Sequence, residues 1–365
     1  MHNPIRAMVL EEFGQPLVLR EFPAPELQPG AVLLRVVAAG ICGSDLEIIE
    51  GQDPRVTLPL IPGHEALGEI AATGGPKTDI FGEPLVEGDL VAFNRGLTCG
   101  CCPACVVQQE PALCAARETY GISVSSATPP HLSGCYADAL YLRPETELIK
   151  LPWDAEPFSL VPATCSGATA AHAIELSHIK PADVVVVIGP GPLGLFAAAF
   201  AFQRGADQVI MIGTGSSPRR LELAETCGCM PVSMAHSSAE DRLELVRGAT
   251  HGLGAAVVVD CAGTASSVTE AVSLVASGGT VTLPGVATPV AGLQLDPYLL
   301  SRRQIRLQGV WTSNVRHLHQ ALVLANSRRY PLDALVTHVL PLEQANEGLE
   351  LLRSKQAIKV VLGSG

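Results

Sequence analysis

The chain has 365 residues, which is long for a single hydrophobic core and suits two domains. It is 47% hydrophobic and 16% charged, a composition that favours a globular protein over a disordered one. Its formal net charge of -12, without a run of Lys or Arg, argues against a nucleic-acid partner, because phosphate backbones bind basic surfaces.

The N-terminal segment has no apolar region followed by a small-residue cleavage site, so we expect no secretory signal. The most apolar stretch, residues 184–202, is interrupted by the GPGP of residues 189–192. It is therefore interpreted as a strand, a turn and a buried helix rather than as a membrane span. We expect a soluble, cytoplasmic protein with no membrane contact.

Residues 1 to about 160 contain short apolar runs separated by Gly and Pro turns, which predict β-structure with long loops. Within one loop, Cys99, Cys102, Cys105 and Cys114 have a spacing that suits tetrahedral zinc coordination by four thiolates. Cys101 leaves the register open, and the equal spacing of the first three favours this set. Because such a site has no open position for a substrate, we expect it to stabilise the loop.

From about residue 167 onward, Val- and Ile-rich strands alternate with helical stretches; the strands read DVVVVIG, QVIMIG, AAVVVDCAG and GTVTLPGV. This alternation is typical of βαβ units in a doubly wound parallel sheet. We therefore predict an α/β protein in which residues 167–308 form a Rossmann domain. Residues 1–166 and 309–365 are expected to form one catalytic domain.

A glycine-rich turn joins the first of these strands to the next helix. Gly189, Gly191 and Gly194 satisfy G-x-G-x-x-G, and Pro192 and Leu193 open the helix. In this context the glycines allow a tight turn, close approach of a pyrophosphate and close helix–strand packing. The segment predicts a dinucleotide site; a ligand-free turn is the alternative.

The end of the second strand bears on the choice of cofactor. NAD sites usually place Asp or Glu there, whereas this chain has Gly213. The hydroxyl of Thr214 and the guanidinium groups of Arg219 and Arg220 follow, and these groups suit a 2′-phosphate. Alternatively, both arginines start a helix and face water. We favour NADP over NAD.

Three further segments are CGSD at residues 42–45, GHE at 63–65 and TCSGATAAHA at 164–173. With the four-Cys loop and the GPGPLG turn, they occur in the order and spacing of the medium-chain zinc-dependent alcohol dehydrogenases. The chain resembles that family over nearly its whole length. The resemblance implies a GroES-like catalytic domain, one catalytic and one structural zinc, and a homodimer or homotetramer. It also implies hydride transfer between a small-molecule alcohol and NAD(P).

The resemblance also assigns ligands. It implies that Cys42, His64 and Cys165 bind the catalytic zinc and leave a fourth position for the substrate oxygen. Glu65 is expected to approach the metal as an exchanging ligand. Asp45 is expected to accept the other ring N–H of His64 and so to orient it.

Other roles implied by the resemblance concern the proton and the cofactor. Ser44 would accept the alcohol proton, Thr169 would pack against the nicotinamide and Lys359 would lie near the pyrophosphate. Many family members carry His three residues after Ser44, where this chain has Glu47. Two interpretations remain open: Glu47 acts as a base, or it is a solvated surface residue and the proton leaves through water.

Two competing functions can be weighed against these residues. A nicotinamide-binding relative without turnover, structural or redox-sensing, would be favoured by a missing zinc ligand, and none is missing. The cysteines argue against a zinc-free quinone reductase. Sorbitol- and threonine-type enzymes typically place Glu where this chain has Cys165, so the third ligand resembles the alcohol-dehydrogenase type. The alcohol itself, primary, secondary or polyol, is left open.

Overall fold

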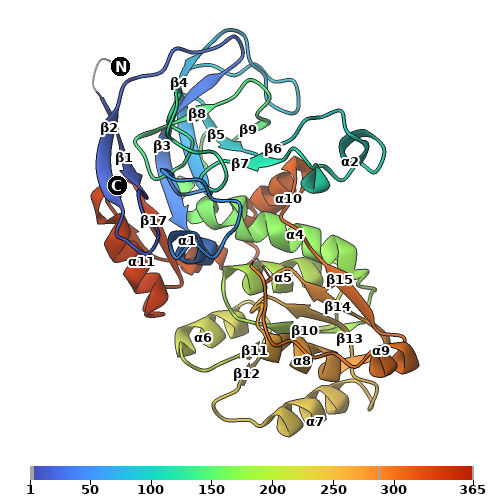
Figure 1. Ribbon diagram of the computed structural model, residues 1–365. Helices are drawn as coiled ribbons and strands as arrows, with labels where there is room; N and C mark the ends of the chain where they lie inside the picture. Colours follow the sequence, from blue (N-terminus) through green and yellow to red (C-terminus); the bar gives the residue numbers. More distant parts are fainter. Residues whose placement is uncertain (1–3, 287, 364–365) are drawn as a thin grey trace. The chain divides into compact units, whose positions relative to one another are not determined.

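The computed structural model describes residues 4–286 and 288–363, and it divides into two compact units (Figure 1). Unit 1 contains Met1–Cys165, Asn314–Leu322 and Leu335–Gly365, and unit 2 contains Ser166–Ser313 and Val323–Ala334. Unit 2 extends past residue 308 because β15 (Arg306–Gly309) pairs with the parallel sheet of that unit.

Unit 1 is built on a seven-stranded sheet with the order β16–β17–β3–β4–β5–β9, in which β8 also pairs with β3. β3 is long and mostly buried, and it carries the apolar run that the sequence shows. The C-terminal strand β17 pairs antiparallel with β3, so the last strand of the chain lies in the same sheet as strands from its first third. The strands are β3 (Val32–Ile41), β4 (Ala66–Thr73), β5 (Leu90–Phe93), β8 (Ala139–Leu142), β9 (Leu148–Lys150), β16 (Val336–Leu340) and β17 (Lys359–Leu362).

Two small two-stranded sheets and short helices complete unit 1. The sheets pair β1 (Ile5–Val9) with β2 (Val18–Phe22), and β6 (Gly96–Leu97) with β7 (Glu118–Thr119). The helices are α1 (Gly43–Ile49), α2 (Pro103–Val106), η1 (Pro111–Leu113), α3 (Pro157–Leu160), η2 (Val161–Thr164), η4 (Leu342–Gln344) and α11 (Ala345–Arg353). Two further helices, α10 (Val315–Asn326) and η3 (Leu332–Leu335), have residues in both units.

Unit 2 is a six-stranded parallel sheet with the order β12–β11–β10–β13–β14–β15. Helices α4 and α5 pack together on one face, and α7 and α8 pack together on the other (Figure 1). The predicted doubly wound α/β fold is confirmed. Its elements are α4 (Ser166–Ser177), β10 (Val184–Ile188), α5 (Pro192–Gln203), β11 (Gln208–Gly213), α6 (Pro218–Thr226), β12 (Met230–Ser233), α7 (Ala239–Ala249), β13 (Ala255–Asp260), α8 (Ala265–Leu274), β14 (Val275–Leu283) and α9 (Pro297–Arg303).

The order of the strands locates a ligand crevice in unit 2. β10 is buried along almost its whole length and lies between β11 and β13, so the strand order reverses beside it. In sheets of this kind, ligands bind at the carboxyl ends of the strands at such a switch point. The glycine-rich turn that follows β10 lies at that end.

Within the described residues, none of the helices combines the length and the apolar character needed to cross a membrane.

Candidate metal centres and cofactor site

Four buried or half-buried side chains of unit 1 form the first candidate metal centre. One ligand atom each of Cys42, His64, Glu65 and Cys165 lies within 4.8 Å of all the others. Cys42 is the N-cap of α1, and Cys165 directly follows η2. His64 and Glu65 directly precede β4, and they are 2% and 0% exposed. Two thiols, an imidazole and a carboxylate are the donor types that zinc takes in proteins, so the set fits that ion.

The two thiols of this cluster shift each other's pKa in opposite directions. Cys165 donates a hydrogen bond that is the main cause lowering the pKa of Cys42 well below its ordinary value, against the effect of burial. The same hydrogen bond, together with burial, raises the pKa of Cys165 well above its ordinary value. A dication would take the place of that proton and favour the thiolate form of both side chains.

Asp45 holds the imidazole of the cluster in place. Its Oδ1 lies 3.3 Å from His64 Nδ1, and its Oδ2 accepts the backbone N–H of Cys42 at 2.8 Å. Burial alone would lower the pKa of His64, but the Asp45 carboxylate raises it to about 9. With Nδ1 turned toward Asp45, Nε2 is the nitrogen left for a metal, and Ser44 Oγ lies 3.5 Å from it.

Tyr136 completes this arrangement, and our interpretation of the sequence missed it. Its hydroxyl donates to Asp45 Oδ2 at 2.8 Å, and its side chain is fully buried. The second hydrogen bond to Oδ2 fixes the carboxylate so that Oδ1 points at His64. Tyr136 lies 91 positions from Asp45, and no local spacing signals such a contact.

The structure gives Lys359 a partner that the sequence did not indicate. Its Nζ donates to Glu65 Oε2 at 2.7 Å, to Glu65 Oε1 at 3.0 Å and to the backbone oxygen of Ile41 at 3.2 Å. Burial alone would lower the pKa of Lys359, but Glu65 more than offsets this effect, so the pKa is raised. A buried ammonium group needs a buried anion, and Glu65 is that anion.

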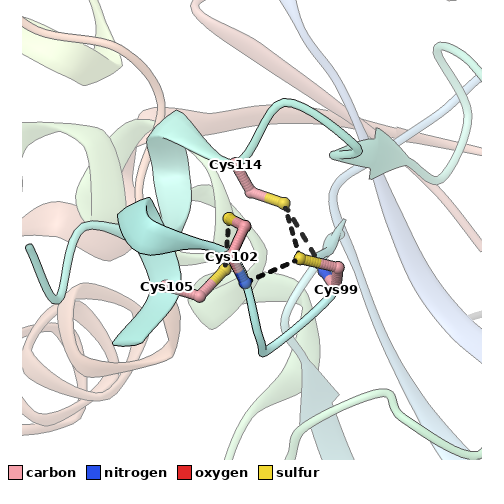
Figure 2. Close-up of side chains that lie close together, drawn as sticks. All are labelled: Cys99, Cys102, Cys105 and Cys114. Carbon is pink, nitrogen blue, oxygen red and sulfur yellow. Dashed lines mark hydrogen bonds between the residues drawn. The ribbon is translucent and has the colours of Figure 1, made fainter. Parts of the chain in front are cut away.

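The cysteine quartet forms the second candidate metal centre (Figure 2). The sulfur atoms of Cys99, Cys102, Cys105 and Cys114 lie within 4.8 Å of one another, and Cys101 is not part of this group. Cys114 Sγ lies 3.5 Å from Cys99 Sγ, and Cys102 Sγ lies 3.6 Å from Cys105 Sγ. Zinc–sulfur bonds of about 2.3 Å in a tetrahedron give sulfur–sulfur distances of about 3.8 Å, so the quartet fits zinc.

Backbone N–H groups of this loop also favour the thiolate form that a metal ion binds. Hydrogen bonds from the backbone of Cys101 and Cys102 lower the pKa of Cys99 to about 6. Cys101 thus contributes its backbone, whereas its own side chain is exposed.

In unit 2 the glycine-rich turn lies between β10 and α5, with Gly191 as the N-cap and Pro192 as the first helical residue. A Cβ at Gly194 would overlap with the carbonyl oxygen of Gly189, so only glycine allows this close packing of helix and strand. The first turn of α5 offers backbone N–H groups to a phosphate. Thr169 is buried in α4 of the same unit.

The residues after β11 that were predicted to bind a 2′-phosphate differ in their distance from the glycine-rich turn and in their exposure. A Cβ at Gly213 would lie 2.7 Å from Pro190 Cγ, so the proline of the turn occupies the space of a side chain there. Arg220 Nη1 lies 3.4 Å from the Cβ position of Gly191, which places its guanidinium beside the glycine-rich turn. Arg219 is exposed, and the Thr214 hydroxyl lies 2.8 Å from that of Ser216.

Comparison with known proteins finds a matching family for each half of the chain. Residues 28–153 match the alcohol dehydrogenase GroES-like domain, and residues 192–327 match the zinc-binding dehydrogenase domain. The 5-exo-hydroxycamphor dehydrogenase of Pseudomonas putida is 32% identical over 94% of this chain and 94% of its own length. The chain belongs to the zinc-binding alcohol dehydrogenase family. The family resemblance found in the sequence is confirmed.

Other relatives agree with this assignment. The D-altritol 5-dehydrogenase of Agrobacterium fabrum is 31% identical over 90% of each chain. A crystal structure of an alcohol dehydrogenase from Thermotoga maritima is 40% identical, with a TM-score of 0.94 over 99% of both chains. This zinc-binding alcohol dehydrogenase is therefore an oxidoreductase that acts on CH–OH groups of small molecules and uses zinc and a nicotinamide cofactor.

The turn after β10 can be tested by Gly194→Ala. The added methyl group would meet the Gly189 carbonyl, so we expect a loss of about 1–3 kcal/mol in the free energy of unfolding and weaker cofactor binding. Thermal denaturation and titration with the reduced cofactor measure the two effects. Gly248→Ala is the control: nothing lies within 4 Å of its Cβ position in α7, so it should stabilise the protein by up to about 1 kcal/mol. Equal behaviour of both variants would contradict the packing argument.

Proposed function

We propose that Cys42, His64 and Cys165 bind a catalytic zinc and that Glu65 serves as an exchanging ligand. The observation that carries this proposal is the convergence of four donor atoms within 4.8 Å, in a group whose histidine is aligned by a buried carboxylate. A zinc ion held there would supply Lewis acidity that lowers the pKa of an alcohol. A bound nicotinamide would supply the hydride acceptor for oxidation of the alcohol to a carbonyl compound.

The residues around the metal ligands handle the proton. Ser44 Oγ lies 3.5 Å from His64 Nε2, and this proximity supports the proposal that its hydroxyl accepts the alcohol proton. Glu47 follows three residues later in α1, and such residues share one side of a helix. We propose that Ser44 passes the proton toward solvent with Glu47 as the acceptor; its carboxylate replaces the histidine of other family members.

The cysteine quartet is proposed to hold a second, structural zinc. All four of its ligand atoms come from the protein, so no position is left for a substrate. The thiolates of both centres must stay reduced, which favours a cytoplasmic location. By its resemblance to the family, the enzyme is proposed to act as a homodimer or homotetramer.

For the cofactor we propose a preference for NADP. Thr169, Gly189, Gly191, Pro192, Leu193 and Gly194 are the residues proposed to line the common part of the dinucleotide site. Gly213 brings no carboxylate that would repel a 2′-phosphate, and Thr214, Arg219 and Arg220 follow it. Relatives use both cofactors: a zinc-binding dehydrogenase from Sinorhizobium meliloti is described as bound to NADP, and one from Sulfurisphaera tokodaii as NAD-dependent.

The two metal centres can be separated by mutation. We expect two zinc ions per wild-type chain by elemental analysis and one in both Cys42→Ser and Cys102→Ser. Cys42→Ser should abolish alcohol oxidation at nearly wild-type thermal stability. Cys102→Ser should lower the melting temperature and spare the chemistry of the folded fraction. Cys101→Ser, the matched control in the same loop, should retain both ions. Retention of both ions in Cys102→Ser would exclude the structural site.

The role of Tyr136 is tested by Tyr136→Phe. Loss of its hydroxyl removes one of the two hydrogen bonds to Asp45 Oδ2, so His64 is held less firmly, and zinc affinity should fall about tenfold to a hundredfold. The zinc affinity is measured by competition with a chelator, with the loss of zinc from each of the two centres followed separately. Tyr120→Phe is the control, because that buried hydroxyl bonds Thr146, away from the cluster. Unchanged retention in Tyr136→Phe would refute the positioning role.

Cofactor choice is tested by Arg219→Ala and Arg220→Ala. The exchange of Gly213 for Asp is unsuitable, because its side chain would meet Pro190. A well-formed charge-assisted contact with the 2′-phosphate is worth about 1.5–3 kcal/mol, so each loss should reduce the ratio of kcat/KM for NADP over NAD by about tenfold or more. Arg247→Ala, an exposed arginine of α7, is the control. A wild-type enzyme that prefers NAD would overturn the assignment.

A further inference from the structure

Arginine side chains gather near the catalytic cluster of a chain that is acidic as a whole. The sequence has 24 Lys and Arg against 36 Asp and Glu. Arg95 lies between β5 and β6, Arg117 lies directly before β7, and Arg55 lies in the loop after α1. All three belong to unit 1. None of them was singled out by a sequence motif.

Arg95 faces the metal ligands. It is 8% exposed and lies within hydrogen-bonding reach of Cys165 and within electrostatic reach of Cys42 and Glu65. The guanidinium group of Arg95 is therefore adjacent to the position where the substrate oxygen is expected.

Arg117 packs against the residue that follows Arg95. A Cβ at Gly96 would overlap with the Arg117 guanidinium and would lie 2.7 Å from its Cζ, so glycine is required for this contact. Arg117 Nη1 also donates to Thr119 Oγ1 at 2.8 Å. The close approach holds the guanidinium group of the half-buried Arg117 beside the chain segment that carries Arg95.

The guanidinium groups repel one another. Burial, followed by the charges of Arg95 and Arg55, lowers the pKa of Arg117 to about 9. Arg55 is balanced by Asp53, whose Oδ1 accepts its Nε–H at 2.9 Å. Like charges in a buried region are costly, and an anion that enters the region reduces this cost.

We propose that Arg95 and Arg117 form an anion subsite, so that the substrate of the proposed zinc site is an alcohol carrying a carboxylate or phosphate group. Guanidinium groups bind both kinds of oxyanion through paired N–H donors. The inference rests on the proposed function and adds to it the class of alcohol.

A different role is conceivable for each arginine on its own. Arg95 balances the second thiolate of the cluster. Arg117 lies within electrostatic reach of Cys114 and could compensate the cysteine quartet. The subsite differs from these roles in one measurable respect, because it discriminates between charged and neutral alcohols.

The test compares alcohols of equal chain length: n-alkanols, ω-hydroxy acids, their methyl esters, and phosphate monoesters of diols. We expect wild-type kcat/KM to be about tenfold to a hundredfold higher for the acids or the phosphates than for the neutral alcohols. The better class identifies the anion. Arg117→Gln should reduce this ratio toward one, and Arg117→Lys should retain part of it. Arg143→Gln is the matched control, because Arg143 pairs with Glu118 in β7.

Three of the following results would decide against the subsite, and one would decide against the proposed function. If wild-type enzyme oxidises neutral alcohols as well as the charged ones, the subsite is refuted and the dehydrogenase stands. If no alcohol is oxidised, the proposed function itself fails. If Arg117→Gln loses the quartet zinc and both substrate classes decline equally, Arg117 is structural. As a measurement independent of any variant, acetate should inhibit oxidation of a neutral alcohol by wild-type enzyme competitively at saturating cofactor, and acetamide should not. Equal inhibition by both would overturn the proposal.

Discussion

The candidate catalytic site depends on one buried carboxylate. Asp45 is fully buried, and each of its oxygens has a defined role: Oδ2 accepts from the Cys42 backbone and the Tyr136 hydroxyl, and Oδ1 faces His64. A buried carboxylate is tolerated only when such partners satisfy it. The same group therefore fixes the first turn of α1, the ring of a metal ligand and a distant tyrosine. Three segments that are separate in sequence acquire a common geometry through it.

Charge balance explains why the C-terminal strand belongs to unit 1. Glu65 is fully buried beside two thiols, and the ammonium group of Lys359 reaches it from β17. The antiparallel pairing of β17 with β3 fixes the position of that lysine. Arg95 approaches Cys165 from another segment of the unit. The cations are thus part of the scaffold, and the anionic ligands of the cluster can be kept close together because these cations surround them.

The two candidate metal centres are assembled in different ways. The quartet arises within one loop, where short spacings and a few backbone N–H groups bring four sulfurs together. The candidate catalytic cluster combines residues from positions 42 to 165, which lie beside α1, β4 and η2. We therefore infer that metal binding by the quartet chiefly stabilises its own loop. The cluster, by contrast, can form only when the distant segments of unit 1 have folded together.

The sequence by itself determined the features that depend on local spacing and periodicity. These are the parallel sheet, the G-x-G-x-x-G turn and the centre formed by Cys99, Cys102, Cys105 and Cys114. Together with the other motifs they also identified the protein family. Tertiary structure alone decided the contacts between distant segments: Tyr136 with Asp45, Lys359 with Glu65, and Arg117 against Gly96. The pairing of Lys359 with Glu65 was not foreseen, because a pattern identifies a cation without identifying its anion. Burial makes charged groups pair with whatever partner the fold brings near, and that partner is set by strand pairing across hundreds of residues.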